Sequence, residues 1–117
     1  MNDATRRAVA YIVGCLNQKN HNTYVYDNTN NKHYNFMFTG SSVYDYSTSK
    51  YLMITRSSNN SYNIYSYLNN NYVMLNFQNN NFNGYDYNSG RHFNGYISGR
   101  NIHIYDFEYS KFYNYLT

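Results

Sequence analysis

A unit of about twenty residues repeats along the chain from Val25 to the C-terminus, and this repeat restricts the possible folds more than any other feature. The first position of the unit is aliphatic in four of the five copies, which begin at Val25, Val43, Ile64, Gly84 and Ile104. The second position is always tyrosine. Four copies have an aspartate at the third position and a basic residue five positions later. A repeat of this length indicates one supersecondary unit per copy.

The acidic and basic positions change together. Four copies contain both residues, as Asp27 with Lys32, Asp45 with Lys50, Asp86 with Arg91 and Asp106 with Lys111. The third copy lacks both and has Ser66 and Asn71 instead. Joint loss indicates a direct contact, and a β-hairpin with a two-residue turn would place the two positions opposite each other. We therefore expect exposed ion pairs that fix the strand register and contribute about 0.2–1 kcal/mol each.

Within each copy, aliphatic residues alternate with tyrosines, which is the period-two pattern of a β-strand. The aliphatic set, which includes Val43, Leu52 and Ile64, predicts a core face, and the alternate set predicts an outer face that is mostly tyrosine. We expect a binding surface built from tyrosines of the outer face and from arginines in the connections between hairpins. Its members are Tyr44, Tyr46, Tyr51, Tyr65, Tyr67, Tyr72, Tyr85, Tyr87, Tyr105, Arg56 and Arg100.

Residues 1–18 differ from the repeat and predict an amphipathic helix with Asp3 as its N-cap and an apolar stripe that excludes Arg6 and Arg7. The chain is therefore expected to be a single, mainly β domain with one N-terminal α-helix. Residues 23–117 would form an antiparallel meander of about five β-hairpins. Two architectures fit this pattern: a curled sheet with the helix packed on its aliphatic face, and a small closed barrel without exposed edges.

The end of the N-terminal segment allows a second interpretation. Ile12 to Cys15, after a pair of arginines and an apolar run, resembles the lipobox of bacterial lipoprotein signals, which would make Cys15 the lipidated first residue of an exported protein. The short apolar run and Asp3 depart from that pattern and favour a helix in a cytoplasmic protein. No stretch of about eighteen apolar residues predicts a membrane-spanning helix.

The sequence predicts no catalytic residue, no metal site and no cofactor. Four of the six acids belong to the repeat and the other two are an N-cap and a turn residue, so none is left to pair as general acid and base. Cys15 falls on the apolar side of the helix, where a small buried hydrophobe is expected rather than a nucleophile. His33, His92 and His103 share the tyrosine face, but no acid or thiol accompanies them as a metal ligand.

The composition favours recognition over catalysis. The chain contains 18 tyrosines and 23 asparagines, whereas only 13% of its residues are charged. Because tyrosine mixed with asparagine and serine makes an adaptable binding surface, we expect a non-enzymatic module that binds a protein partner, in the manner of a small inhibitor or immunity protein. The net charge of +3, without a basic cluster, argues against nucleic acid as the main partner.

Two alternatives also fit the sequence. A glycan-binding module is one, because sugar rings stack on tyrosine and the lipoprotein interpretation would place the module at a cell surface. In period alone, the repeat is similar to the aromatic hairpin repeats of choline-binding and cell-wall-binding modules, although their Gly-Trp signatures are absent. A self-assembling structural repeat protein is the other, because oligomers could form through exposed edge strands.

Overall fold

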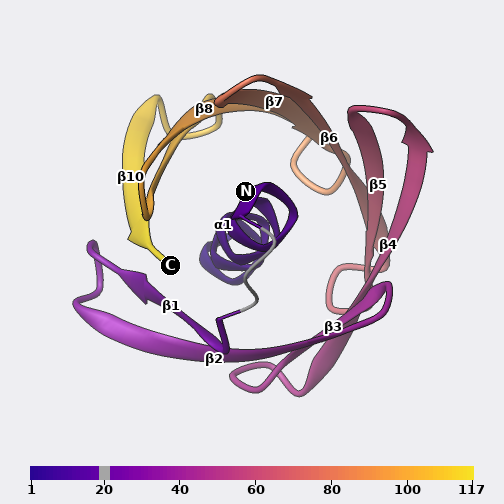
Figure 1. The fold of residues 1–117 in the computed structure, drawn as a ribbon, viewed down its shortest axis with the longest axis horizontal. Helices are drawn as coiled ribbons and strands as arrows, with labels where there is room; N and C mark the ends of the chain where they lie inside the picture. The colour runs from indigo at the N-terminus through magenta and orange to yellow at the C-terminus, as the bar shows by residue number, and fades with distance from the viewer. Residues whose placement is uncertain (19–21) are drawn as a thin grey trace.

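The computed structural model describes residues 1–18 and 22–117. Helix α1 (Asp3–Gln18) comes first, and ten strands follow it. The strands are β1 (Tyr24–Asp27), β2 (Lys32–Thr39), β3 (Ser42–Asp45), β4 (Lys50–Ser58), β5 (Ser61–Ser66), β6 (Asn71–Gln78), β7 (Asn81–Asp86), β8 (Arg91–Ser98), β9 (Asn101–Asp106) and β10 (Lys111–Leu116). Each strand pairs in antiparallel fashion with its neighbours in sequence, and β1 also pairs with β10. The strands therefore form a closed barrel around α1 (Figure 1).

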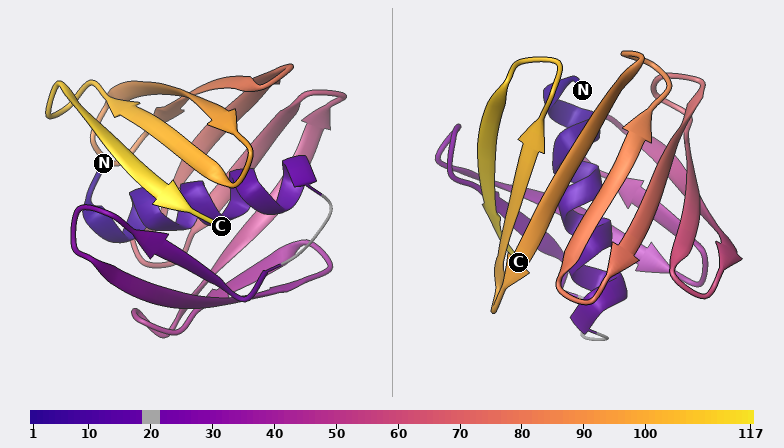
Figure 2. Two further views of the ribbon diagram at one scale, coloured as in Figure 1. Left: turned by 60° about the vertical axis from the view of Figure 1, so that its left-hand side comes forward. Right: turned by 90° about the horizontal axis from the view of Figure 1, so that it is seen from above.

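Of the two expected architectures, the structure has the barrel. About eight strands already enclose an interior that side chains just fill, so a wider barrel needs an additional element inside it. Helix α1 is that element and runs through the barrel (Figure 2). Its residues are buried without a break from Thr5 to Cys15. The expectation that Arg6 and Arg7 lie off the buried stripe is therefore wrong, because strands surround the helix and both arginines are buried.

The two predicted faces of the sheet are confirmed as the inside and the outside of the barrel. Val43, Ile64 and Ile104 are fully buried in one core with α1, whereas the tyrosines at the alternate positions are half-buried or exposed. Every described strand has a neighbour on both sides, so the fold offers no complete edge strand through which copies could pair. The seam that closes the barrel is short, with Tyr26 opposite Leu116 at its end.

Two kinds of turn alternate around the barrel. At one end, which we call the acid end, a four-residue loop joins the two strands of each hairpin, and at the far end two-residue turns such as Gly40–Ser41 join successive hairpins. The acid-end loops are therefore longer than the expected two residues. The last residue of each has a left-handed backbone, with φ between 52° and 69°: Asn31, Ser49, Asn70, Gly90 and Ser110. The N-terminus of α1 lies at the acid end, where Thr5 accepts a hydrogen bond from Asn69 (2.6 Å).

The predicted register of the hairpins is confirmed, but the predicted ion pairs are wrong. The opposed positions are Asp27 and Lys32, Asp45 and Lys50, Ser66 and Asn71, Asp86 and Arg91, and Asp106 and Lys111. Among the described residues, no repeat aspartate lies within 4.0 Å of its opposite base. The reason is that the four carboxylates are buried, whereas the four bases are exposed at the rim.

Each repeat aspartate instead caps its own loop. The backbone N–H of Ser47 donates to Asp45 Oδ1 (2.9 Å), and the N–H of Glu108 donates to Asp106 Oδ1 (3.0 Å). In the third copy, Ser66 Oγ takes the same role and accepts from the N–H of Asn69 (3.3 Å). Aspartate and serine both form such side-chain turns, so the third copy keeps the cap although it lost the charge.

Replacing Asp45 distinguishes a loop cap from an ion pair. Asp45→Ala leaves the N–H of Ser47 without its acceptor and should lower the free energy of unfolding by about 1–2 kcal/mol. Asp45→Ser should restore most of that loss, because serine caps the third loop. Lys50→Ala should change stability by less than about 0.5 kcal/mol. Urea denaturation followed by circular dichroism measures all three variants, and equal losses for Asp45→Ala and Lys50→Ala would contradict the cap.

Inside the barrel, Arg6 joins the helix to the last hairpin. Its Nε and Nη2 donate to Asp106 Oδ2 (3.2 and 3.1 Å), and its Nη1 donates to Asp3 Oδ1 (2.7 Å). Its guanidinium also lies 3.6 Å from the centre of the Tyr113 ring, a cation–π contact. Arg7 makes a similar contact with Tyr34 at 3.7 Å. Arg6 is thus held by the inward-facing Asp106 and a ring of the strands, and Arg7 packs on a ring.

Removal of the Arg6 side chain should be far more damaging than removal of an exposed arginine. Arg6→Ala leaves the buried Asp106 carboxylate with the Met1 amino group but without its guanidinium partner, and should lower the free energy of unfolding by about 3–5 kcal/mol. Arg91→Ala, at the exposed rim, should cost less than about 0.5 kcal/mol. Chemical denaturation of both variants is the measurement. A second substitution, Asp106→Asn, should recover part of the loss, and similar stabilities for the two arginine variants would contradict the buried pair.

Two glycines make room for aromatic rings in the core. A side-chain carbon on Gly84 would lie 2.4 Å from the Phe93 ring, and one on Gly95 would lie 2.4 Å from the Phe82 ring. Each glycine is directly opposite that phenylalanine in the β7–β8 pair. This large-against-small pairing explains why the fourth copy of the repeat begins with glycine where the other copies have valine or isoleucine.

Candidate functional site

The outer tyrosines gather in triplets of rings, one for each hairpin of the second to fifth copies. In each triplet, the tyrosine of the second repeat position lies between two rings that stand edge-on to it. Tyr44 is 5.0 Å from Tyr46 and 4.8 Å from Tyr51, measured between ring centres. The other triplets are Tyr65 with Tyr67 and Tyr72, Tyr85 with Tyr87 and His92, and Tyr105 with Phe107 and Phe112. Such contacts stabilise the hairpins.

The two flanking rings of each triplet are much more exposed than the central tyrosine. Tyr51 is 52% exposed, Tyr72 is 50% exposed and Phe112 is 56% exposed, whereas the central tyrosines are half-buried. We call the eight flanking rings the aromatic collar. Its members are Tyr46, Tyr51, Tyr67, Tyr72, Tyr87, His92, Phe107 and Phe112. Each ring lies at or beside a loop of the acid end, so the collar follows that end of the barrel.

The collar runs around the barrel and is not one flat face. Its four triplets lie on the pairs β3–β4, β5–β6, β7–β8 and β9–β10, which occupy successive sectors of the closed sheet (Figure 1). The first copy leaves a gap, because Asn28 stands where the other copies have a flanking ring, so that Tyr26 has one ring neighbour among the described residues, His33 (4.8 Å). The collar is therefore a curved, interrupted aromatic band.

The structure separates the expected binding residues into two groups. All nine tyrosines lie in the triplets on the outside of the barrel. The two arginines lie at the far end of the barrel, where each donates a hydrogen bond to a backbone carbonyl. Arg56 Nε donates to the carbonyl of Ser58 (3.1 Å). Arg100 Nε donates to the carbonyl of Thr117 (2.6 Å), and its Nη2 lies 3.2 Å from the hydroxyl of Tyr24, next to the seam. The two arginines therefore do not border the tyrosines.

Three members of the collar were missing from the expected set: His92, Phe107 and Phe112. They occupy the same repeat positions as tyrosines in other copies, and that alignment is the sequence signal that could have identified them. The expected set contained only tyrosines and arginines. The triplets instead form from whichever aromatic side chain occupies a given position of the hairpin, whether tyrosine, phenylalanine or histidine.

Two adjoining surface grooves open beside the collar on β6 to β9. One has a volume of about 460 Å³ and is bordered by Tyr87, and the other has a volume of about 550 Å³ and is bordered by Arg91 and Phe107. Asn83 and His92 line both grooves. The combination of ring walls, amides and one guanidinium suits polar recognition, since each groove offers apolar contact together with hydrogen-bond donors.

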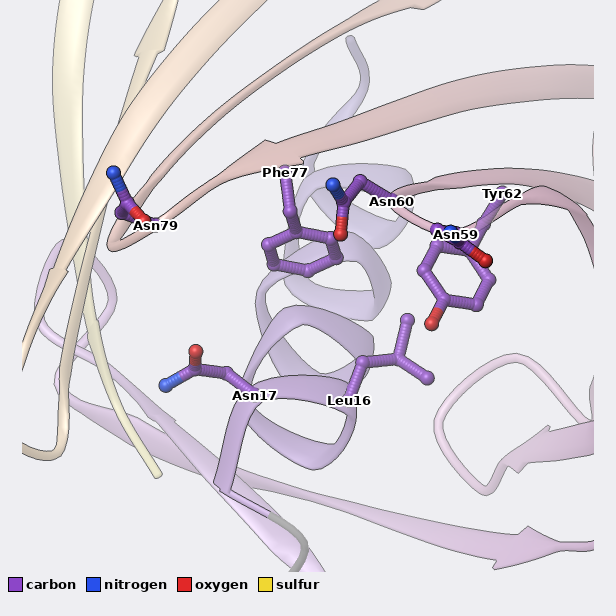
Figure 3. Close-up of a pocket in the computed structure, with 7 residues that line it drawn as sticks. All are labelled: Leu16, Asn17, Asn59, Asn60, Tyr62, Phe77 and Asn79. Atoms are coloured by element: carbon purple, nitrogen blue, oxygen red, sulfur yellow. The ribbon is translucent and has the colours of Figure 1, made fainter.

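A separate cavity of about 320 Å³ lies at the far end, between the last turn of α1 and the β4–β5 and β6–β7 turns (Figure 3). Leu16, Tyr62 and Phe77 supply its apolar wall, and four asparagines complete the lining: Asn17, Asn59, Asn60 and Asn79. Its lining contains no carboxylate, imidazole, thiol or amine, so it offers shape and hydrogen bonds but no group for acid–base or nucleophilic chemistry.

Groups with catalytic or metal-binding potential are already engaged or dispersed. Among residues 1–18 and 22–117, no three of His, Cys, Asp and Glu gather closely enough to hold a metal ion. The buried aspartates cap loops or bind Arg6. Cys15 is 4% exposed, and burial raises the pKa of its thiol, which disfavours the nucleophilic thiolate. Export with lipidation at Cys15 would remove most of α1 from the barrel that it fills.

The Cys15 thiol should be unreactive in the native protein. Because it is buried in the barrel and its pKa is raised, reaction with Ellman's reagent at neutral pH should be at least about 100-fold slower than after unfolding in guanidinium. Absorbance at 412 nm follows the reaction. Ser58→Cys in a Cys15→Ala background provides an exposed control thiol at the far end. Equally fast modification of Cys15 and of the control would contradict an enclosed helix.

No described helix is long and apolar enough to cross a membrane. No family model, no curated protein and no solved structure matches this chain. The residues and their geometry are therefore the basis for assigning a function.

Proposed function

We propose that this protein is a non-enzymatic recognition module that binds a protein partner through the aromatic collar. The observation that carries the proposal is the repeated exposure of two rings per hairpin on the outside of a barrel whose core is complete without them. The inner side chains of the strands and α1 already form one continuous core. Rings such as Tyr67 and Tyr87, each 49% exposed, thus present to solvent apolar surface that the packing of the hairpins leaves uncovered.

The chemistry of the collar suits a protein surface. Tyrosine combines a large, fairly rigid ring with a polar hydroxyl, so it contributes contact area at a low cost in conformational entropy. The edge-on packing within each triplet holds the flanking rings in place before binding, as the contact between Tyr65 and Tyr72 shows (4.9 Å). Pre-organised rings lose less freedom on association. Inhibitors and immunity proteins are small recognition proteins of this general kind, and this comparison is a class analogy only.

A glycan is the second candidate ligand, and the two grooves beside the collar favour it. Sugar rings stack on aromatic side chains and bond to planar amides, and the shared wall of the grooves contains Asn83 and His92 next to Tyr87. The amide of Asn83 accepts a hydrogen bond from Asn76 (3.3 Å), so its orientation is defined. The capture experiment described next separates a glycan from a protein as the ligand.

Loss of the collar should abolish capture of the partner. Immobilised protein is exposed to lysate of the source organism, and bound proteins are quantified by mass spectrometry. Replacing the two flanking rings of one copy at a time by serine should reduce capture of one protein at least about tenfold in one or more copies, because exposed aromatics are typical binding hot spots. Direct binding of the purified candidate, measured by calorimetry, then completes the test.

Tyr96→Ser is the matched control, because Tyr96 is 43% exposed but lies outside the collar, stacked on His103. It should capture the partner as well as the unchanged protein does. Treating the lysate with periodate, which cleaves sugar diols, distinguishes the ligands: retained capture supports a protein surface, and lost capture supports a glycan. Capture that no collar variant changes would rule out the collar as the binding surface.

A further inference from the structure

The net charge of +3 conceals an uneven distribution between the inside and the outside of the barrel. Four of the six acids are buried, at 0–2% exposure: Asp27, Asp45, Asp86 and Asp106. The exposed acids among the described residues are Asp3 and Glu108, and the exposed bases are Lys32, Lys50, Arg56, Arg91, Arg100 and Lys111. Six bases therefore face solvent against two acids. The outer surface is more cationic than the composition suggests.

Four of these bases lie at the acid end, one at the first residue of β2, β4, β8 and β10. Each is followed directly by an exposed ring, in the pairs Lys32–His33, Lys50–Tyr51, Arg91–His92 and Lys111–Phe112. Within the described part of the chain, the side chains of Lys50 and Arg91 make no ion pair or hydrogen bond. The repeat aspartates opposite these bases have turned inward, so they do not neutralise the rim.

The two exposed acids of this end are occupied by cations of the chain itself. Asp3 Oδ1 accepts from Arg6 Nη1 (2.7 Å), and Glu108 Oε1 accepts from the amino group of Met1. Their partners are Arg6 of α1 and the amino group of Met1, at the mouth of the barrel. Lys50 and Arg91 thus remain available to charges on another molecule, whereas Lys32 and Lys111 lie 5.4 and 5.1 Å from the ring centres of Tyr34 and Tyr113.

We propose that this cationic rim, together with the aromatic collar, binds an acidic surface of the protein partner; the inference rests on the proposed function. The groove of about 550 Å³ between Arg91 and Phe107 is the place where one acidic side chain docks. The guanidinium of Arg91 would bind the carboxylate of the partner through two parallel hydrogen bonds. The ring of Phe107 would pack against the methylene groups of the same acidic side chain. The other bases contribute mainly to association rate and orientation, since exposed charges steer encounters more than they strengthen complexes.

The spacing of the bases favours a protein over a nucleic acid. Four copies contribute a single base each, the bases of adjacent copies are separated by one strand, and the third copy has Asn71 at this position, which leaves three strands between Lys50 and Arg91. A site for single-stranded nucleic acid requires a continuous track of basic residues, along which successive nucleobases stack on aromatic rings. The affinity of such a site depends on clustered lysines and arginines. A globular partner seated over the acid end would instead reach several bases of the rim at once.

The experiment measures binding of fluorescent poly-L-glutamate, a model acidic polypeptide, by anisotropy at about 50 mM salt, where surface charges are weakly screened. Lys50→Gln/Arg91→Gln removes two charges from the rim, and Arg56→Gln/Arg100→Gln removes two from the far end. The rim variant should weaken binding about tenfold and the far-end variant less than about twofold. Circular dichroism confirms that both variants are folded. A fluorescent thymidine oligonucleotide is measured in parallel.

Equal losses for the two variants, or no binding of poly-L-glutamate, would overturn the assignment of the rim. Tighter binding of the oligonucleotide than of poly-L-glutamate would overturn the choice of a protein partner in favour of nucleic acid. The rim variant is also used in the capture assay. If it captures the partner as well as the unchanged protein does while collar variants fail, this inference is wrong and the proposed function stands.

Discussion

The enclosure of α1 is the constraint on which the rest of this structure depends. A ten-stranded barrel needs an interior element, and a helix is the one compact element that satisfies its own backbone hydrogen bonds in that space. Because strands surround it, the helix brings Arg6 and Arg7 into the core, and the core must then supply acids and rings to hold them. The inward-facing aspartate of the repeat meets this requirement in the last hairpin, where Asp106 binds Arg6.

The same aspartate position links local and global structure. One carboxylate oxygen of Asp106 caps the loop through Glu108, and the other binds Arg6 and the amino group of Met1. In the third copy, Ser66 keeps only the first of these functions, and the loop reaches α1 through Asn69 and Thr5 instead. The acid–base pattern of the repeat therefore separates the two signs of charge: the aspartates face the interior of the barrel, and the lysines and arginines lie at its rim.

The sequence was sufficient for the repeat, the hairpins, the register and the two faces, because each depends on residue spacing within one copy. It was not sufficient for the contacts of the charged residues. Pairing of positions such as Asp45 and Lys50 is compatible with a four-residue loop, in which the nearest partner of the carboxylate is the N–H of Ser47 rather than the lysine. The environment of Arg6 depends on closure between β1 and β10, which no local pattern encodes. For the same reason, the outer tyrosines were assigned correctly to one side of the sheet, but their distribution around a circumference was not foreseen.

Closure through the short seam also sets how many hairpins the molecule accepts. A linear array can gain or lose a unit by recombination between similar copies and keep its geometry. Here each hairpin adds two strands to the circumference of the barrel. A gained or lost copy would therefore make the interior of the barrel too wide or too narrow for α1. The helix thus sets the number of hairpins: the five units can differ in sequence while the barrel still encloses α1, whereas a barrel with another number of units would not fit it.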